Sequence, residues 1–78
     1  MQMEKLKLII KKIFKIEAAD INDELSPATI STWDSMNYLI FISEIEKEFQ
    51  ITFTMDEILK AKNLGDIKAV MNDKGIRF

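Results

Sequence analysis

Apolar residues recur along residues 3–15 at the spacing of an amphipathic helix, and lysines fill most of the positions between them. The apolar stripe consists of Met3, Leu6, Ile9, Ile10, Ile13 and Phe14. A basic amphipathic helix can also bind membrane surfaces. However, a chain of 78 residues needs every amphipathic helix for its core. The pattern therefore predicts a helix that packs its apolar stripe inward and turns its lysines to solvent.

The helical pattern stops over residues 17–33, where Asp, Asn, Ser, Thr and Pro are frequent. These residue types favour turns, so we expect one long loop. The apolar residues expected to pin this loop to the core are Ile21, Leu25, Ile30 and Trp33. Asp20 begins an imitation of a calcium-binding loop, but Leu25 and Ser31 stand where that loop requires glycine and glutamate. No calcium site is predicted.

A second apolar stripe predicts a helix over about residues 34–49. Asp34 is a good N-cap, because its carboxylate can accept hydrogen bonds from the free N–H groups of the first helical turn. The stripe expected to face the core consists of Tyr38, Phe41, Ile42, Ile45 and Phe49. The opposite face begins with Met36, Leu39 and Ile40. This predicts an exposed apolar patch, unless Leu39 or Ile40 packs under the long loop.

The C-terminal third of the chain predicts two shorter helices. Asp56 opens about one helical turn, and the stretch from Asn63 to Asp66 resembles a capping box at the start of a fourth helix. Gly75 is expected to stop that helix. The prediction is an all-α fold with four helices, a long loop between the first two and a very short third helix. No repeat or boundary divides residues 1–78, so we expect one domain.

Charge is strongly segregated along the chain, although the net charge is −2. Residues 1–16 carry five lysines and one glutamate, residues 17–57 carry ten acids and one lysine, and residues 58–78 carry five bases and two acids. An acidic block between basic ends repels nucleic acid and suits basic protein surfaces. We therefore expect protein partners and no nucleic acid.

The residue types on which much enzyme chemistry depends are missing. The chain has no histidine and no cysteine, which excludes Ser-His-Asp triads, Cys-His dyads and zinc sites built from these residues. A carboxylate pair for glycoside hydrolysis would need a cleft that so short a chain cannot build. The longest N-terminal apolar run, residues 8–10, is too short for a signal segment or a membrane span. The sequence thus predicts a cytoplasmic protein that is not an enzyme, with no metal site and no membrane insertion.

The segment Trp33-Asp34-Ser35-Met36, followed by an amphipathic helix, resembles the acyl carrier proteins, whose signature is Asp-Ser-Leu at the start of the second helix. Residues 45–49 are similar to the family's Leu-Glu-Glu-Glu-Phe stretch. Residues 51–57 resemble the segment that leads into its short third helix, and residues 64–67 resemble the start of its fourth helix. The resemblance covers essentially the whole chain. It departs from the family in Met36, which replaces leucine, in Thr32-Trp33, where a small residue is common, and in a less acidic second helix.

The resemblance implies a small four-helix bundle of acyl-carrier type, in which Ser35 carries a covalent 4′-phosphopantetheine arm. A phosphopantetheinyl transferase would attach the arm from coenzyme A with magnesium, and Asp34 would contact that enzyme or its metal. The arm would hold acyl groups as thioesters for enzymes of fatty-acid, polyketide or other specialised biosynthesis. Such partners, of the acyl-carrier synthetase and ketosynthase types, would bring basic docking patches to a monomeric carrier. The residues expected to meet them are Met36, Leu39, Ile40, Glu44, Glu46 and Glu48.

Two other functions fit the same residues. An aminoacyl or peptidyl carrier would share the serine and the fold, although the acidic middle block favours an acyl carrier. A helical interaction module without a prosthetic group would use Asp34 and Ser35 only as a helix cap. Tryptophan before Asp-Ser is more typical of discrete carriers in specialised pathways than of the housekeeping carrier.

Overall fold

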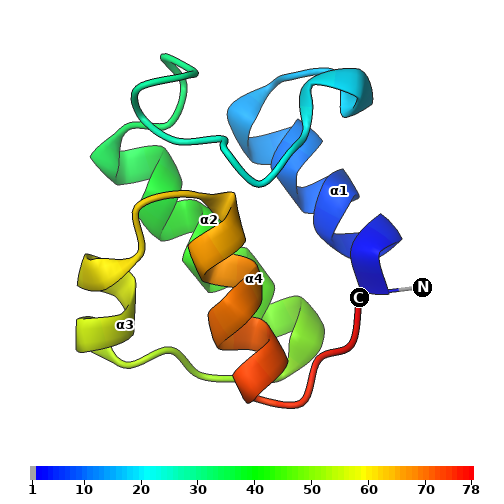
Figure 1. Ribbon diagram of the computed structural model, residues 1–78, viewed down its shortest axis with the longest axis vertical. Coiled ribbons are helices and arrows are strands. Elements are labelled where there is room, and N and C mark those ends of the chain that lie inside the picture. Colours follow the sequence, from blue (N-terminus) through cyan, green and yellow to red (C-terminus); the bar gives the residue numbers. More distant parts are fainter. Residues whose placement is uncertain (1) are drawn as a thin grey trace.

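Four α-helices make up the computed structural model, which describes residues 2–78 and contains no β-strand in that range (Figure 1). The helices are α1 (Gln2–Phe14), α2 (Ser35–Phe49), α3 (Met55–Lys60) and α4 (Leu64–Asp73). Helix α4 crosses in front of α2, and the short α3 lies at the edge of the bundle far from α1 (Figure 1). The predicted all-α fold, with its long loop and short third helix, is confirmed. The sequence did not predict one short 3₁₀ turn in the loop, η1 (Ala18–Asp20).

The predicted apolar stripes of α1 and α2 form the centre of the core. Leu6, Ile10 and Phe14 of α1 are fully buried, as are Phe41 and Ile45 of α2. The other core side chains are Ile9, Leu25, Trp33, Ile42, Phe53, Leu64, Ile67, Met71 and Ile76. No polar or charged side chain among residues 2–78 is buried with them. The core is therefore held by apolar packing, in which each fully buried Leu, Ile or Phe contributes about 1.5–3 kcal/mol.

The long loop is anchored to the core at four points, as predicted. Leu25 and Trp33 are buried, and Ile21 and Ile30 pack partly against the core. The start of α4 holds the middle of the loop. There, the Leu64 N–H donates to the Leu25 carbonyl at 2.9 Å. A loop tied down in this way presents the residues that follow it in a defined position.

The helix starts are capped by side chains, although one cap differs from the prediction. Asn63 accepts the Asp66 N–H at 2.8 Å. The Asp66 carboxylate does not complete a capping box, because it accepts the Lys62 N–H instead, also at 2.8 Å. The complete capping box lies at α3, where Thr54 and Glu57 each accept the other's backbone N–H. Beyond α4, Gly75 has a φ of +98°, which favours glycine and supports the predicted stop.

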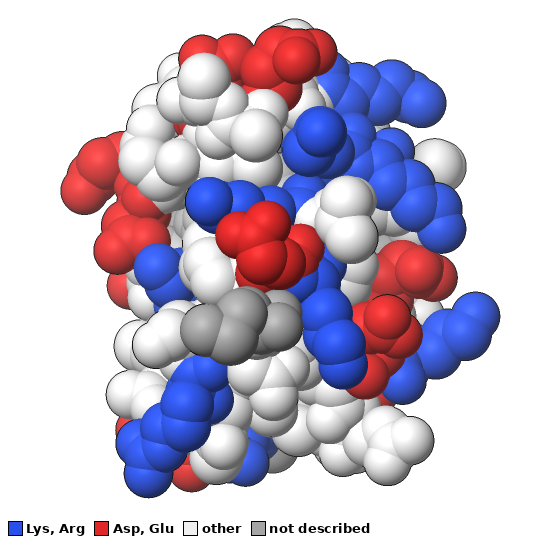
Figure 2. All heavy atoms as spheres, turned by 90° about the vertical axis from the view of Figure 1, so that its right-hand side faces the viewer, with Lys and Arg blue, Asp and Glu red and all other residues white. Residues whose placement is uncertain are grey.

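Lysine side chains of α1 gather on one face of the molecule. Figure 2 looks at the side on which α1 lies in Figure 1, and much of this face is blue. Lys5, Lys11 and Lys12 are exposed, which confirms the predicted solvent-facing side of α1, and Lys15 just after the helix is exposed as well. None of the helices within residues 2–78 has the length and apolar composition to cross a membrane.

Candidate functional site

Ser35 is the first residue of α2 and stands where the long loop meets the helix. The preceding residue, Asp34, has an extended backbone, and its carboxylate accepts the Asn37 N–H at 2.8 Å. The side-chain amide of Asn37 in turn donates to the Thr32 carbonyl at 2.9 Å. These two bonds fix the junction from both sides, so the predicted N-cap is confirmed and the position of Ser35 is well defined.

The Ser35 side chain is exposed, and its hydroxyl makes no side-chain hydrogen bond within the described part of the chain. Asp34 uses its carboxylate on the backbone of Asn37. The N–H groups of Ser35 and Met36 precede the first intrahelical bond, which runs from the Tyr38 N–H to the Asp34 carbonyl at 2.8 Å. These N–H groups point out of the positive end of the helix dipole, where a phosphate group is stabilised.

An open groove of about 380 Å³ begins at Ser35. Its walls come from the loop at Trp33, from the first turn of α2 at Ser35 and Tyr38, and from Leu59 and Lys62 in and after α3. We call it the Ser35 groove. An exposed hydroxyl, free helix N–H groups and an adjoining apolar groove fit a phosphodiester-linked prosthetic group on this serine.

Tyr38 connects the walls of the Ser35 groove. Its ring stacks on Trp33 with centroids 5.7 Å apart, and Trp33 stacks on Phe14 at 4.8 Å. Its hydroxyl donates to the carbonyl of Ile58 in α3 at 2.6 Å. Burial, and secondarily the negative charge of Asp66, raise the pKa of the Tyr38 phenol. Tyr38 therefore stays a neutral donor at physiological pH and links α1, the loop, α2 and α3.

The outward face of α2 exposes apolar side chains next to Ser35. Met36 is 72% exposed, Leu39 55% and Ile40 42%. Neither Leu39 nor Ile40 packs under the loop, so the predicted exposed patch is confirmed. Helix α3 adds two more exposed apolar residues, Met55 and Leu59. Exposed apolar side chains of this size are typical of a surface that contacts other proteins.

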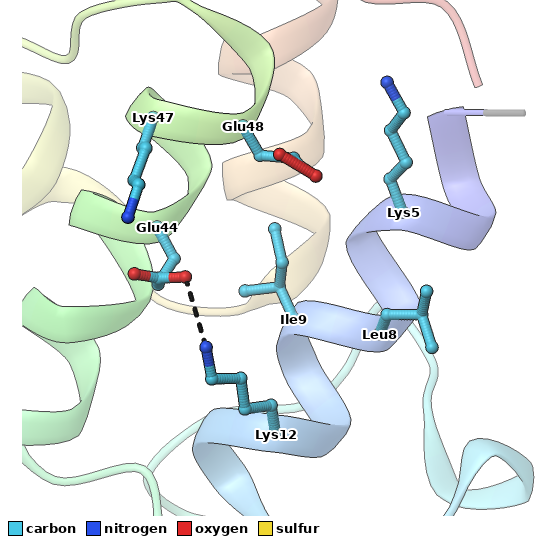
Figure 3. Close-up of a pocket in the computed structure, with 7 residues that line it drawn as sticks. All are labelled: Lys5, Leu8, Ile9, Lys12, Glu44, Lys47 and Glu48. Atoms are coloured by element: carbon cyan, nitrogen blue, oxygen red, sulfur yellow. Dashed lines mark ion pairs between the residues drawn. The ribbon is translucent and has the colours of Figure 1, made fainter.

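The three glutamates expected beside this patch do not share one face. Glu44 forms an ion pair with Lys12 of α1 at 3.6 Å, and Glu48 lies near it in a second groove, between α1 and α2 (Figure 3). Glu46 is turned to the segment before α3, where its carboxylate accepts the Phe53 N–H at 2.8 Å. Two of the three carboxylates therefore already have partners within the fold.

The groove between α1 and α2 has a volume of about 300 Å³ and is a weaker candidate site. Figure 3 shows two lysines of α1, and one lysine and two glutamates of α2, around Leu8 and Ile9. The opposite charges partly neutralise one another, and no hydroxyl group lines the groove. The groove at Ser35, with its exposed hydroxyl, is therefore the stronger candidate site.

The sequence alone did not indicate most of the residues that line the Ser35 groove. Tyr38 was expected only as part of the core, and Leu59 and Lys62 were assigned no role. Their position depends on how α3 folds back toward the start of α2. The spacing of three residues between Ser35 and Tyr38 puts both on one side of a helix, which was the one available signal.

Comparison with known proteins gives one family and one fold. Residues 4–71 match the model of a family described as the phosphopantetheine attachment site. The structure is similar to that of a protein assigned as an acyl carrier protein from Mycobacterium tuberculosis, with a TM-score of 0.82 and 20% sequence identity. The match covers 95% of this chain and 99% of the other. No curated protein matches the chain by sequence.

Proposed function

The chain belongs to the family of proteins with a phosphopantetheine attachment site, and we propose that Ser35 carries the prosthetic group and that acyl groups are its cargo. Members of this family are carriers and not catalysts, and their 4′-phosphopantetheine is bound covalently. We treat residues 1–78 as one carrier domain. The activity then lies in presenting a thioester to other enzymes.

The placement of the Ser35 hydroxyl is the observation that carries this proposal. It is exposed at the start of a 15-residue helix, beside free N–H groups and a groove. Other serines lack this combination. Ser26 accepts the Ala28 N–H within the loop at 3.2 Å, and Ser43 lies in the middle of α2. Ser35 is thus the serine where a phosphodiester gains most from the helix dipole.

The attachment reaction needs a second protein. The Ser35 oxygen would form a bond to the pantetheine-side phosphorus of coenzyme A, while the phosphoanhydride bond breaks and adenosine 3′,5′-bisphosphate leaves. The hydroxyl proton must go to a base. The nearest carboxylate in sequence, Asp34, already accepts the Asn37 N–H. We therefore assign the base and the magnesium ion to a phosphopantetheinyl transferase, with Asp34 positioning the serine.

Partner enzymes are proposed to dock on the outward face of α2. Met36, Leu39 and Ile40 supply apolar contact beside the attachment point. Glu48 is exposed and free to meet a basic patch, whereas Glu46 is engaged with Phe53. Weak contacts suit a carrier that must leave each enzyme, because the tethered cargo already has a high effective concentration there.

Intact-mass measurement tests the proposal. The protein is incubated with coenzyme A, magnesium and, separately, several phosphopantetheinyl transferases of broad specificity. We expect the wild type and the control variant Ser43→Ala to gain one phosphopantetheinyl group, and Ser35→Ala to gain none. No gain by a folded wild type with any of the transferases would favour the interaction module, in which Asp34 and Ser35 only cap the helix.

A further inference from the structure

Leu8 is an exposed apolar residue of α1 that the core of the bundle does not use. Its side chain is 67% exposed, whereas Leu6 and Ile10 of the same helix are fully buried. Figure 3 shows that Leu8 points away from α2, the helix against which α1 packs. A single exposed leucine is common on protein surfaces, so the residues around it decide whether it has a role.

The neighbours of Leu8 on the surface of α1 are mostly lysines. Residues three and four positions apart lie side by side on a helix, which gives Leu8 one acidic neighbour, Glu4, and three basic ones. The basic neighbours, all exposed, are Lys5, Lys11 and Lys12. Lys12 forms the ion pair with Glu44, but its side chain remains 71% exposed. We call Leu8 and these three lysines the Leu8 face.

A second exposed apolar residue adjoins the Leu8 face near the start of α1. Lys5 also lines an open groove of about 560 Å³, together with Arg77 and Phe78. Phe78 is 45% exposed. Within residues 2–78, no Asp or Glu side chain lines this groove. Two exposed apolar side chains, Leu8 and Phe78, are therefore set among cations.

This combination fits an anionic lipid surface better than an acidic protein. The centres of protein interfaces are depleted in lysine and enriched in arginine, and the Leu8 face has three lysines and no arginine. Long lysine side chains can hold their ammonium groups at the lipid headgroups while a neighbouring leucine or phenylalanine enters the boundary with the acyl chains. Because salt screens charges beyond about 10 Å, the distant acids of the chain oppose this attraction only weakly.

The Leu8 face is turned away from the proposed attachment residue. Phe14, on the buried side of α1, stacks on Trp33 at 4.8 Å, and Trp33 lines the Ser35 groove. Helix α3, which forms another wall of that groove, lies far from α1 (Figure 1). A surface that holds the exposed side of α1 therefore leaves Ser35 open to another protein.

We propose that the Leu8 face, with Phe78 beside it, attaches the protein to the anionic headgroups of a lipid bilayer. Its lysines meet the lipid phosphates, Leu8 and Phe78 enter the headgroup boundary, and the buried stripe of α1 stays in the core. The attachment is peripheral, and no helix enters the bilayer. This inference goes beyond the proposed function, because it does not depend on the group that Ser35 carries.

Sedimentation with lipid vesicles tests the inference on the whole chain. Sucrose-loaded vesicles contain either phosphatidylcholine alone or equal parts of phosphatidylcholine and phosphatidylglycerol. We expect at least about fivefold more protein to sediment with the anionic vesicles in low salt, and this difference to disappear at about 1 M NaCl, where the Debye length is about 3 Å. Equal sedimentation with the two kinds of vesicle, or sedimentation with neither, would overturn the proposal.

Two double variants with the same net charge locate the binding surface. Lys5→Gln with Lys11→Gln removes two charges from the Leu8 face and should lower binding to the anionic vesicles at least about fivefold. The matched control, Lys60→Gln with Lys62→Gln, removes two charges in and just after α3 and should bind as wild type. All four lysines are exposed, so both proteins should fold, which circular dichroism checks. Equal binding by the two variants would contradict the assignment of this face.

The variant Leu8→Trp shows whether this position reaches the lipid. Its fluorescence should move to shorter wavelength with the anionic vesicles, whereas the wild type, whose single tryptophan is 5% exposed, should show no shift. A polyglutamate peptide distinguishes lipid from acidic protein and should bind far more weakly than the vesicles. An unshifted spectrum with bound vesicles, or equally tight binding of polyglutamate, would overturn the proposal, and the second result would assign the face to an acidic protein.

Ser35→Ala separates this inference from the proposed function. We expect this variant to sediment with anionic vesicles as the wild type does, although it gains no phosphopantetheinyl group. Loss of vesicle binding in Ser35→Ala would contradict the independence of the two surfaces. A wild type that gains the group but does not bind vesicles would leave the carrier function intact and overturn only the membrane attachment.

Discussion

The carboxylate of Glu46 in α2 accepts a hydrogen bond of 2.8 Å from the backbone N–H of Phe53, seven residues further along the chain. Phe53 is buried, and the segment around it connects α2 to α3. The sequence suggested that Glu46 faces partner proteins. The structure instead gives its carboxylate a role inside the fold, where it satisfies a partly buried N–H group and sets the path into α3.

Replacing Glu46 with alanine should therefore lower stability. A hydrogen bond between a charged group and a partly buried N–H contributes about 1–2 kcal/mol, since its loss leaves the N–H without a partner. Urea unfolding of Glu46→Ala should show a decrease of this size. The control is Glu48→Ala, an exposed change on the same helix that should stay within about 0.5 kcal/mol of wild type. Equal effects of the two variants would contradict the structural role of Glu46.

The Asp34 carboxylate allows a test that separates capping from charge. Asp34→Ala removes the cap on Asn37 and should cost about 1 kcal/mol in urea unfolding, whereas Asp34→Asn keeps an acceptor and should cost much less. If Asp34 also helps the transferase or its metal, Asp34→Asn should still slow the gain of the phosphopantetheinyl group in a mass-resolved time course. An unchanged rate would limit Asp34 to its role as a cap.

The sequence predicts those parts of the fold that depend on interactions between residues close together in the chain. The helices of Leu6 and Phe41 are readable because apolar spacing repeats within each helix. The capping box of Thr54 and Glu57 is also local, and its S/T-x-x-E pattern could have been recognised. The Asp66 carboxylate differs, because it accepts the Lys62 N–H and not the N–H of the N-cap residue Asn63, and the path of the chain before α4 decides which one it meets.

The candidate site likewise has a part that depends on neighbouring residues and a part that depends on residues far apart in the chain. The cap at Asp34 was predicted from its place just before a helix start, and Ser35 as the attachment residue was implied by the resemblance to the acyl carrier proteins. The bond between Tyr38 and Ile58 joins residues 20 positions apart. It depends on the return of α3 toward α2, which no local pattern encodes, so the groove could only be found in the structure.

Acid should weaken the fold partly through Glu57. The Glu57 pKa is lowered, first by the hydrogen bond from the Thr54 N–H at 2.8 Å and then by Lys74 at 3.0 Å. A carboxyl whose folded-state pKa is depressed stabilises the fold fully above its unfolded pKa, near 4.5, and this contribution is lost as pH falls through the folded value. Urea unfolding from pH 7 to pH 3 should therefore show a smaller acid loss in Glu57→Gln than in wild type. Parallel pH profiles would contradict this assignment.

Gln50 ends α2 in a left-handed conformation, with φ and ψ of 57° and 47°. This region costs a non-glycine residue about 1–2 kcal/mol, while glycine adopts it freely and loses about 0.5–1 kcal/mol through its more flexible unfolded chain. The difference predicts that Gln50→Gly raises the free energy of unfolding by about 0.5 kcal/mol, measured by urea unfolding. Gln50→Ala is the matched control, since it removes the same side chain without relieving the backbone and should not stabilise the protein. If both variants changed stability equally, the side chain and not the backbone conformation would determine the energy at this helix end.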